Sequence, residues 1–136
     1  MADAFSTHEV ANQPPPLAGH DVFSSDRALA EALGREGAAW AEDQLVALGR
    51  EAGSSDAQEA GRLANEHPPT LLTHDRYGHR VDVVEYHPAY HRLMATAVGH
   101  GLHAAPWADG RPGAHVARAA KVLTWYQVDG GHICPI

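Results

Sequence analysis

The sequence predicts an all-α fold, a helical bundle preceded by an extended, proline-rich amino-terminal arm. Apolar residues recur at intervals of three and four along most of the chain, as they do on the buried face of a helix. Candidate capping residues and prolines mark where these periodic segments begin and end. The 136 residues, of which 44% are hydrophobic and 20% charged, suffice for one domain with a real core.

The arm is expected to cover residues 1–23, and the helical domain residues 24–136. Pro14, Pro15 and Pro16 favour a polyproline-like backbone that lies across a neighbouring surface or extends into solvent. Phe5, Val10, Leu17 and Phe23 suggest that the arm docks. The arm also lacks the basic and apolar regions of a secretion signal.

Three helices are expected in the first half of the domain. The first covers residues 26–40 behind Ser24 and Ser25, which are good N-cap types. The second covers residues 41–53 and ends at a glycine suited to a left-handed C-cap. The third begins with a capping box formed by Ser55 and Gln58, and ends before two prolines that cannot continue a helix.

The second half contains two further helices. Residues 68–86 show only partial alternation and are expected to form a long connection with at most a short strand. A fourth helix is expected to run from Pro88, which suits the first helical position, to about Gly101. The last helix lies within residues 114–131 and is apolar nearly all the way round, which is typical of a helix in the middle of a bundle.

Composition limits the partners and the compartment. The formal net charge of −7 comes from 17 acidic and 10 scattered basic residues, which disfavours nucleic acid as a partner. No segment approaches the roughly 18 uninterrupted apolar residues that span a bilayer, so no membrane partner is expected. The single cysteine, Cys134, cannot form an internal disulfide, and we therefore expect a cytoplasmic protein.

The eleven histidines raise the question of a metal site. His87 and His91 have the spacing of paired ligands on a helix, but the residues between them are Pro, Ala and Tyr rather than the Glu of a helical zinc motif. We therefore interpret His87 as an N-cap or as the residue just outside the helix, and His91 as its neighbour at the edge of the packed face. Two other pairs also lack cysteine or carboxylate neighbours: His74 with His79, and His100 with His103. No metal ligand is assigned.

No catalytic or cofactor-binding residue is assigned either. A thiol and imidazole pair of Cys134 and His132 is conceivable, but a buried, unreactive cysteine is the favoured interpretation. Adjacent carboxylates such as Glu42 and Asp43 point to different sides of a helix. The aromatic residues that could stack on a planar ligand are more often part of a core; they are Trp107, Trp125 and Tyr126.

Five blocks of sequence, in this order, resemble the amino-terminal part of the AidB branch of the acyl-CoA dehydrogenase family. They are "NQPPPL" (12–17), "REGAAW" (35–40), "AGRLANEHPP" (60–69), "HPAYHRLM" (87–94) and "GAHVARAAKVLTWYQVDGGHICPI" (113–136). The resemblance covers nearly the whole chain. It implies a helical amino-terminal domain, to be followed by a β-barrel domain and a carboxy-terminal helical domain.

The resemblance also implies an FAD-dependent parent that oxidises an acyl-thioester, or protects DNA from alkylation, as a homo-tetramer. In that family FAD lies between the two later domains and a partner subunit, and its binding loop and the catalytic glutamate follow the region covered here. DNA binding is attributed to the missing carboxy-terminal domain. No family site residue therefore transfers to this sequence, and no cofactor is expected for this chain alone.

The sequence thus predicts a structural domain without turnover. The apolar finish "ICPI" directly after an apolar helix suggests a fragment of a longer protein. An alternative of another class is a stand-alone, histidine-rich helical module that binds a metal or a protein partner.

Overall fold

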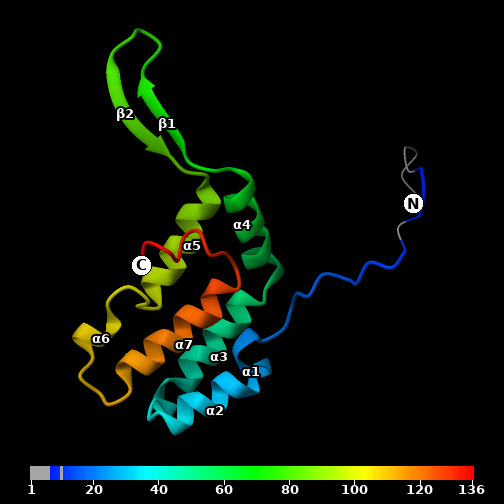
Figure 1. Ribbon diagram of the computed structural model, residues 1–136, viewed down its shortest axis with the longest axis vertical. Coiled ribbons are helices and arrows are strands. Elements are labelled where there is room, and N and C mark those ends of the chain that lie inside the picture. The colour runs from blue at the N-terminus through cyan, green and yellow to red at the C-terminus, as the bar shows by residue number, and fades with distance from the viewer. Residues whose placement is uncertain (1–6, 10) are drawn as a thin grey trace.

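The computed structural model describes residues 7–9 and 11–136 (Figure 1). Two helices form around the end of the arm, α1 (Val22–Ser25) and α2 (Arg27–Arg35), followed by a 3₁₀ turn (Ala39–Ala41). The longer helices are α3 (Glu42–Ala52), α4 (Ser55–Glu66), α5 (Pro88–Gly99) and α7 (Ala114–Tyr126), with the short α6 (Ala105–Ala108) before the last. Two strands, β1 (Thr70–His74) and β2 (Arg80–Glu85), separate α4 from α5.

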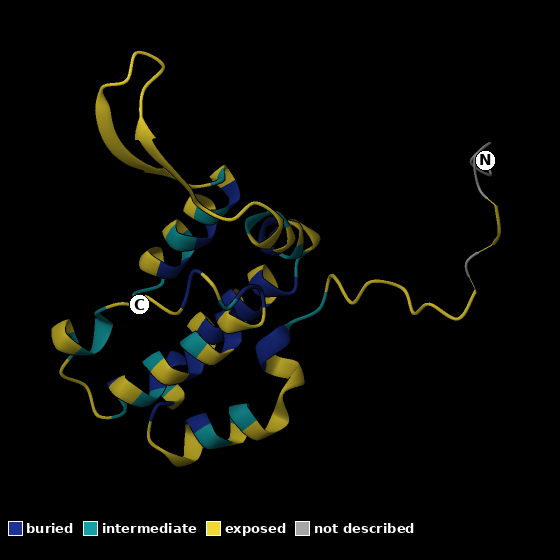
Figure 2. Ribbon diagram, turned by 45° about the horizontal axis from the view of Figure 1, so that its top comes forward, coloured by how far each residue is buried: buried dark blue, intermediate teal, exposed yellow. Residues whose placement is uncertain are grey.

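The core consists of two clusters of buried apolar side chains. One cluster joins α4 and α5 to the centre of the molecule and includes Leu48, Leu93 and Trp125. The other lies where α2 meets α3 and α7, and includes Leu33 and Leu45. Because α3 and α7 contribute to both clusters, these two helices connect the halves of the helical body (Figure 2).

The expectation of a purely α-helical fold is wrong, because residues 70–85 form an antiparallel β-hairpin. Leu71 is paired with Val84 and Leu72 with Val83, and the register shifts between Leu72 and His74. The shift leaves one extra residue on β2, which is a β-bulge. The bulge interrupts the alternation of the sequence, and this explains why the pattern predicted no more than a short strand.

Several helix starts differ from the sequence-based expectation. The first predicted helix is divided into α1, α2 and the 3₁₀ turn. Ser24 and Ser25 are part of α1, and the carboxylates of Asp21 and Asp26 cap α1 and α2. The predicted boundary at residue 24 therefore lies inside the helical body, which begins at Val22.

At α4 the cap is shifted by one residue. The hydroxyl of Ser54, not Ser55, accepts a hydrogen bond from the backbone N–H of Ala57 at 3.1 Å. The side chain of Gln58 donates to the carbonyl of Ala52 instead of completing a capping box. Gly53 does not have the expected left-handed conformation, because its φ is −80°.

The two later helices lie where the sequence placed them. Pro88 opens α5, and the His87 ring caps it. α7 is buried through Ala117, Ala120 and Trp125, but it is not covered on every side, since Leu123 and Tyr126 are more than half exposed.

The described part of the arm has no helix or strand as far as Gly19, and its side chains are exposed there. Leu17 is 78% exposed, so it does not dock on the helical body. Phe23, the last residue of the expected arm, is buried in α1. Phe5 and Val10 lie outside the described residues. Across residues 7–9 and 11–136, no helix is long and apolar enough to cross a membrane.

Candidate functional site

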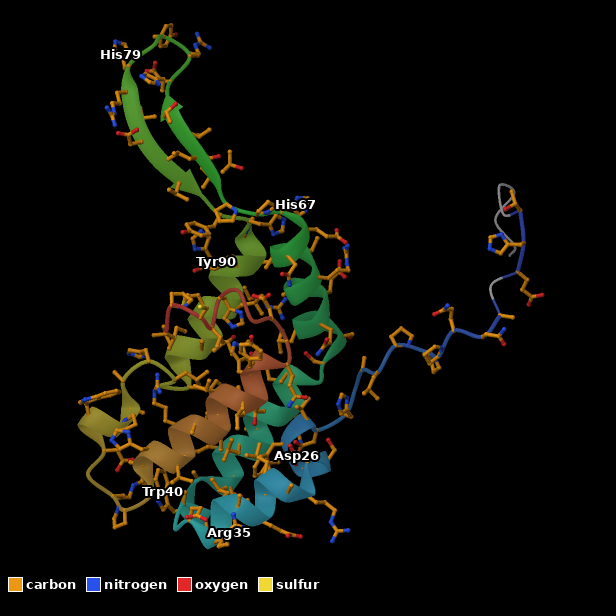
Figure 3. The ribbon with its side chains drawn as sticks, viewed as in Figure 1. Asp26, Arg35, Trp40, His67, His79 and Tyr90 are labelled. Carbon is orange, nitrogen blue, oxygen red and sulfur yellow. The ribbon has the colours of Figure 1, made fainter. Side chains whose placement is uncertain are left out.

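A groove lies where the hairpin joins the helical body. We take it as the candidate site because aromatic side chains and a buried carboxylate line it together. Its volume is about 440 Å³. It is lined by the end of α4, the prolines that follow, the start of α5 and the turns after α7, through Ala64, Asn65, Pro68, Pro69, Tyr86, Tyr90, Asp129, Gly131 and Pro135. In Figure 3, Tyr90 lies at the upper end of the helical body, close to the base of the hairpin.

Two stacked tyrosines form one wall of the groove. The rings of Tyr86 and Tyr90 lie 4.4 Å apart between centroids, with an angle of 23° between their planes. Burial, together with Tyr86 and Asp129 nearby, raises the pKa of Tyr90. The Tyr90 hydroxyl therefore stays protonated at neutral pH and can donate a hydrogen bond.

A buried carboxylate, Asp129, forms the polar floor. It accepts hydrogen bonds from the side-chain amide of Asn65 at 2.7 Å, from the backbone N–H of His132 at 3.0 Å, and pairs with the His132 ring at 2.9 Å. Burial alone raises the pKa of Asp129, but the hydrogen bonds from His132, Gly131 and Asn65 outweigh it and hold the pKa below its usual value. Asp129 is therefore ionised at neutral pH.

The His132 ring is fully buried beneath this floor. Since Nδ1 faces the ionised Asp129, we assign the ring proton to Nδ1. Nε2 is then a buried acceptor without a hydrogen-bond partner among the described residues. The Nε1–H of Trp125 is a buried donor that also lacks a partner there, and the Trp125 ring lies edge-on to His132 with 6.0 Å between the ring centroids. Nε2 does not line the groove, so this pair fastens the turn after α7 and offers no accessible base.

The histidines singled out from the sequence have structural contacts. His87 caps α5 by accepting from the N–H of Ala89 at 3.2 Å, and its ring stacks on His67 at 4.8 Å. His91 lies edge-on to Tyr86 and Tyr90. The interpretation of His87 as a capping residue is confirmed.

The remaining histidine pairs do not converge on a site. His79 pairs with Asp75 at 2.9 Å in the hairpin turn, whereas His74 contacts Thr73. His100 lies 3.4 Å from Glu51, while His103 is exposed. Within residues 7–9 and 11–136, no group of three or more His, Cys, Asp or Glu side chains is placed to hold a metal ion.

The other candidates are also dispersed. Cys134 is exposed, contrary to the expectation of a buried thiol, and the His132 ring turns to Asp129 rather than to it. Glu42 and Asp43 are exposed in the first turn of α3. Of the three aromatic residues expected in the core, only Trp125 is buried. Trp107 is 74% and Tyr126 is 56% exposed.

Sequence reasoning missed the network of Asn65, Asp129 and His132. The spacing of Asp129 and His132 in "DGGH" is the only local signal, because a carboxylate three residues before a histidine can bond its N–H in a turn. The partner Asn65 is 64 residues away, and only the packing of α4 against the turn after α7 brings it into reach.

Comparisons with known proteins agree with this fold. The family model described as the Adaptive response protein AidB N-terminal domain matches residues 12–136. The chain is 46% identical over 133 residues to a protein of Escherichia coli (strain K12) whose name is "Putative acyl-CoA dehydrogenase AidB". This match covers 97% of the chain but only 25% of that relative's length.

Two solved structures share the fold. Caenorhabditis elegans ACDH-11, solved in complex with C11-CoA, has a TM-score of 0.76 at 20% identity, over 93% of this chain and 22% of that one. The apo-form of Bd2924 has a TM-score of 0.72 at 24% identity, over 82% of this chain and 23% of that one. With the family match over most of its length, the chain belongs to the family of AidB amino-terminal domains.

Proposed function

We propose that this chain is the structural amino-terminal domain of a longer, FAD-dependent flavoprotein of the AidB type, and that it has no turnover by itself. The observation that carries the proposal is the coverage, since 97% of the chain aligns with a relative of which it spans only 25%. The whole protein would oxidise an acyl-thioester or a related substrate, or protect DNA from alkylation.

The domain would act as a scaffold. Exposed apolar side chains on the helical body are suited to packing against further domains; they include Val98 on α5, Trp107 on α6, and Leu123 and Tyr126 on α7. The groove beside Tyr86 and Tyr90 could form one wall of a substrate channel that the other domains complete.

The groove beside Tyr86 and Tyr90 does not suit FAD on its own. The groove has the ionised Asp129 as its floor, and no lysine or arginine lines it, so it would repel the pyrophosphate of FAD. We therefore assign flavin binding to the other domains and derive no chemical step for this chain.

The other domains are the expected partners. A homo-tetramer is proposed for the whole protein, and contact with double-stranded DNA, if made, is assigned to the carboxy-terminal domain. The net charge of −7 supports this assignment. The cytoplasm is the proposed location, supported by the single cysteine.

A complementation experiment tests the proposal. The chain alone is expected to bind no FAD and to reduce no electron acceptor in the presence of acyl-CoA. When co-expressed with the remaining three-quarters of the Escherichia coli relative, it should co-purify with that polypeptide and restore a yellow flavoprotein. Acyl-CoA oxidation by the chain alone, or failure to co-purify, would overturn the proposal. The alternative of a histidine-rich module that binds a metal or a protein partner stays a prediction; among the described residues no group of three or more His, Cys, Asp or Glu side chains is placed to hold a metal ion.

A further inference from the structure

The groove at the base of the hairpin holds a negative charge that its lining does not neutralise. Asp129 lines it as a buried, ionised carboxylate. Among the described residues its only ion-pair partner is the His132 ring, which is neutral because its proton lies on Nδ1 alone. No lysine or arginine lines the groove, and Arg62 of α4 is already paired with Glu59 and Glu66. The groove therefore keeps the charge of the carboxylate.

The carboxyl end of α4 adds partial negative charge to the same groove. Ala64 and Asn65 lie in its last turn and line the groove. Four residues further along are Pro68 and Pro69, which have no N–H and cannot donate the next helical hydrogen bonds to these two carbonyls. In Figure 3, His67 marks this end of α4. Carbonyl groups at the end of a helix carry the negative end of its dipole, which favours a cation.

Two tyrosine rings add acceptors and an aromatic surface. Tyr86 and Tyr90 stack on one another, and both line the groove. Tyr86 is 37% exposed, so part of its ring is open to a ligand, and neither hydroxyl has a hydrogen-bond partner among the described residues. A cation over a tyrosine ring is attracted by the negative face of its π system. The wall of the groove thus favours the same sign of charge as its floor.

We propose that this groove binds a guanidinium group. A guanidinium is planar, so it can stack on a tyrosine ring while its five N–H donors meet carboxylate, carbonyl and phenol oxygens. An ammonium group has only three donors and is more strongly hydrated. The volume of about 440 Å³ lies in the range of small-molecule sites. The inference goes beyond the scaffold role and depends only on residues of this chain.

Titration with three small probes tests the chemistry of the groove. N-Butylguanidinium is compared with N-butylurea, which has the same planar shape without the charge, and with butylammonium, which has the charge without the planar group. The NMR signals of Tyr86 and Tyr90 report binding to the 136-residue chain. We expect N-butylguanidinium to bind roughly tenfold more tightly than either of the other probes. Equal affinity for N-butylguanidinium and N-butylurea would overturn the proposal, as would an absence of saturable binding.

Three variants assign the binding to the groove. Tyr86→Leu removes part of the aromatic wall and should weaken N-butylguanidinium binding roughly fivefold. Tyr77→Leu is the control, because Tyr77 lies in the hairpin turn and outside the groove, and it should leave the affinity unchanged. Asp129→Asn should abolish the preference over N-butylurea, with circular dichroism to check that the helices persist. Equal effects of Tyr86→Leu and Tyr77→Leu would overturn the proposal, and this comparison decides even if Asp129→Asn does not fold.

The guanidinium can belong to a free molecule or to an arginine side chain of the longer protein, and the complex with the rest of the Escherichia coli relative distinguishes these sources. With a free ligand, N-butylguanidinium should bind the complex as tightly as it binds the chain alone. With an arginine in the groove, it should no longer bind, and Tyr86→Leu should lower the co-purified yield. Loss of binding with an unchanged yield would overturn the proposal.

The two proposals fail separately. The probe titration uses the 136-residue chain without a partner, so a failure to co-purify would overturn the proposed flavoprotein and leave the guanidinium site standing. Co-purification without any preference for N-butylguanidinium in the chain alone would have the opposite meaning.

Discussion

The buried imidazole of His132 pairs with the carboxylate of Asp129 at 2.9 Å, and Asp129 in turn holds Asn65 of α4 at 2.7 Å. These contacts join the turn after α7 to the end of α4, beside the groove at the base of the hairpin. A bonded carboxylate buried this deeply is costly to disturb, because each lost partner leaves a polar group without water.

The variant Asp129→Asn should therefore destabilise the domain. The replacement keeps the shape but sets an amide N–H₂ against donors, so that one of the hydrogen bonds is lost. We expect a loss of about 1–3 kcal/mol in the free energy of unfolding, measured by urea titration. Glu31→Gln removes an exposed carboxylate of α2, 4.0 Å from Arg27, and serves as the control that should leave stability unchanged.

The contribution of Asp129 should depend on pH. Because the folded-state pKa lies below the usual value of 3.8, the stabilisation is fully present above the unfolded-state pKa and is lost as the pH falls through the folded-state pKa. The difference in unfolding free energy between wild type and Asp129→Asn should shrink as the pH falls below about pH 4. A difference that grows on acidification would contradict the assigned direction.

Two glycines should respond in opposite ways to alanine. A Cβ at Gly61 in α4 would meet the backbone carbonyl of Val128, so Gly61→Ala should destabilise the domain by about 1–3 kcal/mol. A Cβ at Gly34 in α2 would have no neighbouring atom within 4 Å, and Gly34→Ala should stabilise the domain by about 0.4–1 kcal/mol. Thermal unfolding of both variants measures the contrast, and equal effects would show that α4 and the turn are not closely packed.

His87 should behave as a capping residue and not as a metal ligand. His87→Ala removes the acceptor for the Ala89 N–H and should cost about 0.5–2 kcal/mol, whereas His87→Asn should recover much of this stability. Dialysed wild-type protein should contain less than stoichiometric zinc. One zinc per chain, lost in both His87→Ala and His91→Ala, would instead support the metal-binding alternative.

Helix positions that depend only on residues close together in the sequence could be predicted. Pro88 and His87 together mark the start of α5, and the segment from Ala114 to Tyr126 is helical as its apolar spacing indicates. Where two neighbouring residues compete for one role, the sequence was ambiguous. Ser54 caps α4 instead of Ser55 because its hydroxyl reaches the N–H of Ala57, and adjacent serines do not reveal this choice.

The hairpin was underestimated for a related reason. Its strands are defined by pairing across the turn, where Asp75 accepts from the N–H groups of Tyr77 and His79, and the bulge beside Asp82 removes the simple alternation. A pattern of period two detects a strand only where its pleat is regular.

The sequence by itself determined the family, the helical body and most helix ends, because periodicity, prolines and caps act over a few residues. Only the tertiary structure decided that Asp129 has Asn65 and His132 as partners, that Leu123 and Tyr126 remain exposed, and that both strands of the hairpin are exposed. These features depend on contacts between segments far apart in the chain, and no local pattern encodes such distances.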